Sequence, residues 1–507
     1  MKKKPVIIIS LLMAILLAAV VFLMNREESR KTDGKIAVVT TFYPMYEFTK
    51  NIVGNQGQVS LLVKAGTEVH DFEPSTRDVS KIQEADAFVY DSDSMESWVT
   101  SVKKSVDTKK VPFIEATEKM ILAPGTEEGD HDHGHEGHHH AYDPHVWLSP
   151  KRAVSLVENI RDELSHHFPK KAEVFKENAA AYIKKLQALD KDYSHALSKA
   201  QQKSFVTQHA AFGYLALDYG LTQIPITGLT AESEPSAKRL ADLSQYVKGY
   251  GIDYIYFEEN ASSSVSKTLA DEAGVKTAVL SPLESLTKKQ MEAGEDYFSV
   301  MRRNLKALRK TTDAAGKAIQ PEKDNSKTVA NGYFKDKNVK DRKLSDWTGK
   351  WQSVYPYLKD GSLDSVWDYK AKSKKDMTAQ EYKAYYTKGY KTDVDKIAID
   401  GKKNTVTFTQ KGKDYKYTYK YVGYKILNYS KGNRGVRYLF ETKSKNAGSF
   451  KYIQFSDHGI KPQKAEHFHL FWGSESQDKL LEELENWPTY YPNKLSGQEI
   501  AQEIVAH

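Results

Sequence analysis

Apolar and polar segments alternate along the chain in a way that predicts an α/β fold for its first part. Between Lys35 and about Leu280, short runs of β-branched and aromatic residues alternate with longer amphipathic stretches. We predict strands at six of these runs, at residues 36–39, 59–63, 87–90, 204–207, 253–257 and 276–280. A repeated order of strand and helix is typical of α/β units with parallel sheets.

One long amphipathic stretch interrupts this alternation. Residues 170 to about 203 contain neither glycine nor proline, and their apolar positions follow helical spacing. These positions are Phe175, Ala179, Tyr182, Ile183, Leu186 and Leu189. The stretch therefore predicts one long helix, which divides the α/β region into two lobes.

The pattern changes after a polar stretch at residues 311–331, which contains Gly316, Pro321 and many charges. Beyond it, tyrosine and tryptophan are frequent, and residues 405–409 and 415–421 alternate as in antiparallel strands with one polar face. We expect a mainly β barrel or sandwich with a few helices, closed by an amphipathic helix that starts near Ser496. The predicted domains are 32–315 and 336–507, with a linker at 316–335.

The N-terminus has the pattern of an export signal. Lysines at positions 2 to 4 precede an apolar run at residues 6–24, and a charged stretch begins at Arg26. As a helix the run would span about 28 Å, which is close to the thickness of a bilayer core. Residues 1–31 are thus predicted to be a signal peptide or a membrane anchor, with the rest of the chain outside the cytoplasm.

Composition limits the chemistry that the chain can perform. Its 507 residues carry a net charge of +7, but the basic residues are spread among acidic ones, so we expect no nucleic-acid partner. The sequence has no cysteine, which excludes disulfides, thiolate ligands and a lipid-modified cysteine. Any bound metal must be held by carboxylates and by some of the 16 histidines.

Three histidines stand in predicted loops after strands. They are His70 within residues 67–75, His145 within 143–150 and His209 within 207–212. Open α/β sheets bind their ligands at such strand ends. A single histidine is more often a structural residue than a ligand, but three in this setting together predict a metal site.

The stretch from about 36 to 308 resembles the zinc-specific cluster A-I substrate-binding proteins of bacterial metal ABC transporters, which are similar to ZnuA. The resemblance rests on Val-His-Asp-Phe-Glu-Pro-Ser at 69–75, Asp-Pro-His-Val-Trp-Leu at 143–148 and His-Ala-Ala-Phe-Gly-Tyr at 209–214. It implies two lobes joined by a rigid helix, with one metal ion between them. The implied ligands are His70, His145, His209 and Glu284.

These ligand types favour zinc on chemical grounds as well. Three imidazoles and one carboxylate suit Zn(II), whereas Mn(II) prefers a larger share of oxygen donors. Manganese-binding relatives carry a carboxylate at the position of His209. Cu(II) would bind such donors at least as tightly, so selectivity for zinc must depend on geometry and metal availability.

A histidine-rich tract at residues 130–140 is predicted to gather zinc near this site. Its glycines make a regular helix implausible, so the H-E-x-x-H pattern at 135–139 is not expected to form a protease site. The auxiliary ligands are His131, His133, His135, His138, His139 and His140.

A second metal site is predicted near the C-terminus. His467 and His469 are two residues apart, so on a strand both face the same side, and His458 after the preceding strand can supply a third nitrogen. The stretch 347–507 resembles the periplasmic zinc-binding ZinT family, with a calycin-like barrel, at residues 351–356, 435–438 and 466–469. The resemblance implies the same three histidines as ligands.

Together these patterns predict an extracytoplasmic component of a bacterial ABC transporter that captures Zn(II) and delivers it to a permease and its ATPase. The resemblance implies the cell surface of a Gram-positive-type bacterium. Such relatives are lipoproteins, but Asn25 stands near the position expected for an acylated cysteine, so we expect no lipid. We expect no enzymatic activity. A zinc hydrolase and an adhesin remain the alternatives, and the sequence offers no convincing general base for the first and no determinant for the second.

Overall fold

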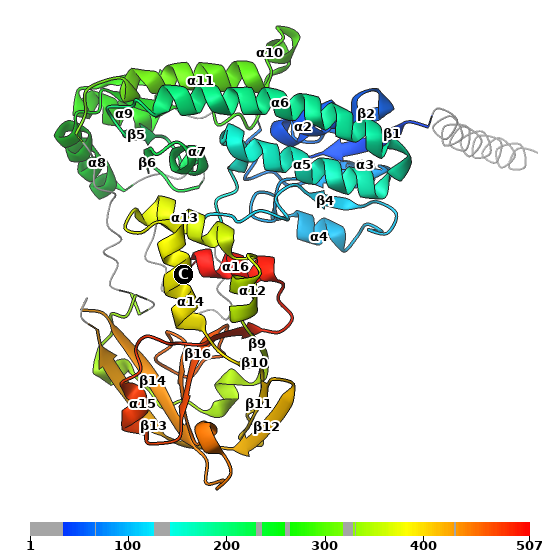
Figure 1. The fold of residues 1–507 in the computed structure, drawn as a ribbon. Coiled ribbons are helices and arrows are strands. Elements are labelled where there is room, and N and C mark those ends of the chain that lie inside the picture. Colours follow the sequence, from blue (N-terminus) through cyan, green and yellow to red (C-terminus); the bar gives the residue numbers. More distant parts are fainter. Residues whose placement is uncertain are drawn as a thin grey trace, which may run out of the picture. The chain divides into compact units, whose positions relative to one another are not determined.

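The chain folds as two compact units, residues 1–319 and 320–507, shown in Figure 1. The computed structural model describes residues 34–65, 67–125, 142–229, 236–258, 264–317, 328–329, 331–429 and 432–506. The predicted signal or anchor at 1–31 and the histidine-rich tract at 130–140 lie outside these ranges. The domain limits given above stay a prediction.

The first unit contains two four-stranded sheets, and every neighbouring pair of strands in them is parallel. The first sheet has the order β2-β1-β3-β4, with β1 (Ile36–Thr40), β2 (Gly57–Leu61), β3 (Ala87–Tyr90) and β4 (Phe113–Glu115). The second has the order β6-β5-β7-β8, with β5 (Ser204–Thr207), β6 (Thr222–Pro225), β7 (Tyr254–Phe257) and β8 (Lys276–Val279). The predicted α/β fold with parallel sheets is confirmed.

Sequence patterns located six of these eight strands. The edge strands β4 and β6 were missed. β4 has only three residues, and in β6, with the sequence Thr-Gln-Ile-Pro, only Ile224 is buried, so no apolar run marks it. The helices that pack around the two sheets are α2 (Tyr43–Val53), α3 (Thr76–Gln83), α4 (Val99–Lys103), α5 (Pro150–His167), α7 (Gly213–Asp218), α8 (Ala237–Tyr250), α9 (Ser264–Ala273) and α11 (Tyr297–Thr312). The short helix α10 (Lys288–Glu292) has no buried residue and lies beyond α11, away from the sheets.

The predicted long helix is α6 (Ala172–Leu197), and it holds both lobes. Near its start, the Asn178 side chain donates to the carbonyl of Ile52 in the first lobe at 3.0 Å. Near its end, Tyr193 donates to the carbonyl of Met301 in α11 at 2.6 Å. One continuous apolar core runs from the first lobe through α6 into the second, so the lobes are packed together through this helix.

The second unit is built on a nine-stranded antiparallel sheet that curls into a half-barrel (Figure 1). Its order is β12-β11-β10-β9-β17-β16-β15-β14-β13. The strands are β9 (Gly349–Ser353), β10 (Val394–Asp400), β11 (Thr405–Gln410), β12 (Lys413–Thr418), β13 (Lys420–Asn428), β14 (Arg434–Glu441), β15 (Tyr452–Ser456), β16 (Phe468–Gly473) and β17 (Thr489–Pro492). This arrangement is consistent with the predicted calycin-like domain, and aromatic side chains make up much of its core.

Residues 415–421, which the sequence predicted to lie in antiparallel strands, belong to two strands, β12 and β13. The chain passes there from β12, at one edge of the sheet, to β13, at the other edge. Tyr419 lies between the two strands, and its buried hydroxyl donates to the carbonyl of Phe450 at 2.6 Å. Because Tyr419 also faces the core, the alternation of inward-facing and outward-facing residues continues from β12 into β13 without a break in the sequence pattern.

Five helices accompany the sheet in the described part of this unit. They are α12 (Tyr355–Lys359), α13 (Asp364–Lys374), α14 (Ala379–Tyr390), α15 (Gln477–Leu481) and α16 (Gly497–Ala506). The last one is the closing helix that the sequence predicted. Within the described residues of the whole chain, none of the helices has the length and apolar character needed to span a membrane.

Candidate metal centres

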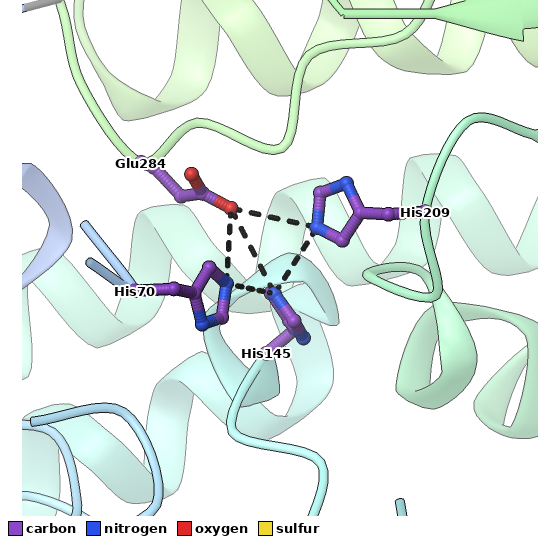
Figure 2. A group of neighbouring side chains, drawn as sticks. All are labelled: His70, His145, His209 and Glu284. Atoms are coloured by element: carbon purple, nitrogen blue, oxygen red, sulfur yellow. Dashed lines mark hydrogen bonds and ion pairs between the residues drawn. The ribbon is translucent and has the colours of Figure 1, made fainter. Parts of the chain in front are cut away.

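Four predicted ligands from distant parts of the chain meet between the lobes of the first unit (Figure 2). His70 lies in the loop after β2, and His145 caps the short turn that precedes α5. His209 and Glu284 follow β5 and β8 of the second sheet. Because the carboxyl ends of parallel strands meet at one edge of a sheet, the topology brings these residues together.

Distances within this group fit a tetrahedral ion. Nε2 of His145 lies 3.2 Å from Nε2 of His70 and 3.3 Å from Nε2 of His209. Oε1 of Glu284 lies 3.6 to 3.9 Å from the three Nε2 atoms. Zinc bonds of about 2.0–2.1 Å in a tetrahedral site separate the ligand atoms by about 3.3–3.4 Å, so the four atoms nearly fit Zn(II).

Burial makes this arrangement unfavourable without a cation. Glu284 is only 9% exposed, and its Oε1 atom has no hydrogen-bond partner in the described structure. His145 and His209 are almost completely buried. A buried carboxylate oxygen that faces imidazole nitrogens without a hydrogen bond is costly, and a divalent cation at their centre would satisfy all four atoms.

Two further carboxylates are hydrogen bonded to the Nδ1 atoms of two of the imidazoles, on the side away from the centre of the site. Oδ1 of Asp143 lies 2.8 Å from Nδ1 of His145, and a carboxylate oxygen of Glu258 is hydrogen bonded to Nδ1 of His209. These contacts direct the Nδ1–H groups to the carboxylates, so in both rings Nε2 is the atom that faces the centre and can bind a metal. Ligating histidines in metal proteins commonly have such outer partners.

The four candidate ligands differ in their tendency to hold a proton. Burial and the neighbouring His145 and His209 lower the pKa of His70 to about 2, and burial keeps the pKa of His145 well below its usual value. Burial also disfavours charge on His209, but the carboxylates of Glu258 and Glu284 outweigh it and raise the pKa to about 9. Burial raises the pKa of Glu284 to about 8, although charged His209 opposes this. At neutral pH, protons therefore occupy part of the site.

The second unit brings His458, His467 and His469 together, as the sequence predicted. Their rings lie 5.5 to 5.8 Å apart between centroids, and one possible ligand atom of each lies within 4.8 Å of the others. His467 precedes β16, His469 lies in it, and His458 follows β15. Strands β15 and β16 are paired, with Ser456 opposite His469, which explains why the three rings share one face.

Contacts around these rings orient two of them. Nδ1 of His469 lies 2.8 Å from Oγ1 of Thr489, which itself donates to the carbonyl of Trp487 at 2.9 Å. Thr489 must then accept from Nδ1–H, which leaves Nε2 of His469 available as a metal ligand. The ring of His467 stacks on Tyr491 at 5.2 Å.

The two sites differ in access and in the number of ligands. The first has four candidate ligands, of which three are buried. The second has three, and His458 is exposed to solvent. A site with three protein ligands leaves a position for water or for an exchanging ligand, whereas four ligands close the sphere of a tetrahedral ion. The role of these residues as ligands is a prediction that the geometry supports.

The outer partners were not identified from sequence. Asp143 lies inside a quoted motif but received no role, and Glu258 was not considered. Glu258 directly follows β7, so the rule that placed His209 at a strand end would also have found it. Thr489 gives no such signal, because its function depends on the pairing of β16 with β17.

Two parallel-sheet lobes packed on one long helix, with a buried candidate cation site between them, are the arrangement of a solute-binding receptor for a metal ion. Residues 38–311 match the family model described as zinc-uptake complex component A, periplasmic (ZnuA), and residues 325–507 match ZinT (YodA), periplasmic lipocalin-like zinc-recruitment. The chain belongs to the ZnuA family of zinc-uptake components and carries a ZinT domain after the ZnuA domain.

Relatives with the same two domains extend over nearly the whole chain. Zinc-binding protein AdcA of Streptococcus pyogenes serotype M3 is 66% identical and covers 94% of this chain and 95% of its own. Zinc-binding lipoprotein AdcA of Streptococcus pneumoniae serotype 4 is 62% identical, over 96% and 97%. The crystal structure of Zn(II)-bound AdcA from Streptococcus pneumoniae is 61% identical, with a TM-score of 0.83, and covers 94% of this chain and 100% of that chain.

Proposed function

We propose that this protein captures Zn(II) outside the cytoplasm at two separate sites and delivers it from the first site to an ABC permease. Its family is that of zinc-uptake components, so it acts with an ABC transporter and zinc is the transported ion. The proposal assigns the first site to His70, His145, His209 and Glu284. It assigns the second to His458, His467 and His469.

One observation carries the first assignment. The buried Oε1 atom of Glu284 has no hydrogen-bond partner in the described structure, yet it faces three imidazole nitrogens at 3.6 to 3.9 Å. Hydrogen bonds within the protein leave this oxygen unsatisfied, and a tetrahedral cation would satisfy it together with the imidazoles. The donor set of three nitrogens and one oxygen favours zinc over manganese.

The second site is proposed to recruit zinc rather than to release it to the permease. Its exposed His458 and its free coordination position suit rapid uptake from solution. The histidine-rich tract at 130–140 is proposed to gather further zinc at lower affinity. Two sites of unequal access would allow zinc to be collected at the open site and held at the closed one.

The remaining parts of the proposal concern the partners, location and chemistry of the protein. The relatives act outside the cytoplasmic membrane, and at least one is a lipoprotein. We propose that residues 1–31 export this chain or anchor it, and that a permease and its ATPase receive the ion. We expect no hydrolysis at the first site, because four ligands leave no position for an activated water.

Calorimetric titration of metal-free protein with zinc tests the two sites. Two tight equivalents are expected for the wild type. The double variant His70→Ala/His209→Ala should lose one of them, and His467→Ala should weaken the other. His195→Ala, which removes an exposed histidine on α6, is the matched control and should retain both. Unchanged binding in both test variants would refute the assignment.

A further inference from the structure

A completely buried arginine lies beside the loop that carries His458. The side chain of Arg342 has no exposed surface, and its guanidinium donates three hydrogen bonds. Nη1 donates to Oδ1 of Asp457 at 2.6 Å, Nη2 to the carbonyl of Gln463 at 2.7 Å, and Nε to Oδ2 of Asp346 at 3.0 Å. Asp457 and Gln463 stand on the two sides of the loop, so one side chain fixes both.

The backbone around Arg342 also holds this loop. The amide of Lys340 donates to the carbonyl of Ile460 at 2.8 Å, and the amide of Ala465 donates to the carbonyl of Asp346 at 2.8 Å. A side chain at Gly459 would place its Cβ atom 2.9 Å from Nη1 of Arg342. Glycine at this position therefore lets the loop lie directly against the guanidinium.

His458 itself needs such support because its backbone is strained. Its φ angle is 62°, in the left-handed region that non-glycine residues rarely adopt. A conformation of this kind persists only where the surroundings enforce it. Oδ1 of Asp457, which Arg342 holds, also accepts a hydrogen bond from the amide of Gly459 at 3.2 Å. One carboxylate thus fixes the backbone on both sides of His458.

We propose that Arg342 is a positioning residue for the second zinc site, which it serves by holding the backbone of His458 so that the imidazole faces His467 and His469. This inference rests on the ligand set proposed above. It also implies that the segment from Lys340 to Trp347, which follows the predicted linker, belongs structurally to the second site. Trp347 supports the arrangement, since the guanidinium stacks on its ring at 4.1 Å.

An alternative is that Arg342 contributes only to stability. Buried ion pairs are weak evidence for stability, because apolar residues of similar volume often serve as well. A role through His458 makes a different prediction. The loss of Arg342 should lower zinc affinity when His458 is present and should have little effect when His458 is absent.

A double-mutant cycle tests this difference in the full chain with the first site removed by His70→Ala and His209→Ala. Zinc affinity is measured by competition with a chelator for Arg342→Met, His458→Ala and the combination. Arg342→Met alone should weaken binding about 10- to 100-fold, as outer residues of metal sites commonly do. Added to His458→Ala, it should weaken binding by less than about threefold. Arg437→Met is the matched control, since Arg437 is also buried, bonds two carbonyls and stacks on Phe471.

The possible results separate the inference from the proposed function. Unchanged affinity in His458→Ala would overturn the ligand set itself. Two results would overturn the inference alone. In the first, His458→Ala lowers zinc affinity and Arg342→Met does not. In the second, both variants lower the affinity and their effects multiply in the combination. If Arg342→Met does not fold, Asp457→Asn replaces it, because the amide keeps an acceptor for Gly459 but loses the charge that pairs with Arg342. Asp457→Asn should lower zinc affinity when His458 is present and should have little effect in the His458→Ala background.

Discussion

Oδ1 of Asp143 accepts two hydrogen bonds from His145, one from the backbone amide at 3.0 Å and one from Nδ1 at 2.8 Å. The carboxylate therefore fixes both the position of the residue and the tautomer of its ring. This contact is independent of metal, so the imidazole is oriented before zinc arrives. Preorganisation of this kind reduces the conformational entropy that the imidazole loses when zinc binds.

The first prediction follows from this contact. Asp143→Asn keeps the shape of the side chain but removes the negative charge that favours Nδ1–H, so zinc affinity at the first site should fall about 10- to 100-fold. Competition with a chelator measures the change. Asp218→Asn is a suitable control, because Asp218 pairs with Arg152 and Ser149 rather than with a histidine of the site. Wild-type affinity in Asp143→Asn would show that the outer carboxylate does not matter.

Metal preference should depend on His209. In His209→Asp the new carboxylate would lie in a buried pocket with Glu258 and Glu284, so repulsion should prevent tight binding of any divalent ion. The double variant His209→Asp/Glu258→Gln relieves part of this repulsion and should bind manganese better than the wild type does, with zinc at least tenfold weaker. Titrations with each metal measure the ratio. An unchanged preference for zinc in the double variant would contradict this view of selectivity.

Zinc binding at the first site should weaken as the pH falls. The pKa of His209 is raised to about 9 and that of Glu284 to about 8, so this pair holds protons at pH 7 that zinc must displace. With a pKa of about 2, His70 competes with no proton in this range. Affinity should therefore rise with pH up to about 9, and zinc binding near pH 7 should release protons from the pair of His209 and Glu284.

Calorimetry in buffers of different ionisation enthalpy counts these protons. Glu258→Gln removes a carboxylate that raises the pKa of His209, so this variant should release fewer protons than the wild type does. If the wild type and Glu258→Gln released equal numbers of protons, His209 would not be the group that carries the displaced proton. Measurements on His467→Ala protein reduce the contribution of the second site to the count.

Zinc should stabilise the two compact units separately. Zinc at about a thousand times its Kd stabilises a folded domain by about 4 kcal/mol, which corresponds to a rise in Tm of roughly 10 °C for units of this size. Scanning calorimetry should show one shifted transition for each unit. His467→Ala should reduce the shift of one transition only. A single cooperative transition in all variants would contradict independent units.

The sequence was sufficient to predict much of this architecture, for identifiable reasons. Strands in parallel sheets are buried on both faces, so β3 and β5 appear as short apolar runs and were predicted with correct limits. The lack of glycine and proline in α6 made the long helix evident. His70 and His209 stood out because their motifs follow strands, and His145 stood out through its motif alone, since it directly precedes the short turn before α5.

Other features depend on contacts that no local pattern encodes. Glu284 was implied only by resemblance, since a carboxylate after a strand is common and its missing hydrogen bond appears only in three dimensions. The contacts of Arg342 join residues more than 100 positions apart, at Asp457 and Gln463. The boundary between β12 and β13 was not located because inward-facing residues continue through Tyr419.

The core that passes through α6 has a consequence for how the ion leaves. Side chains of both lobes pack around α6, so a rotation of the two lobes away from each other would expose apolar surface along this helix. Discharge to a transporter should instead proceed by small displacements of the loops that bear the four ligands. The permease would then displace those loops and weaken the coordination of zinc, while the two sheets and α6 keep their positions.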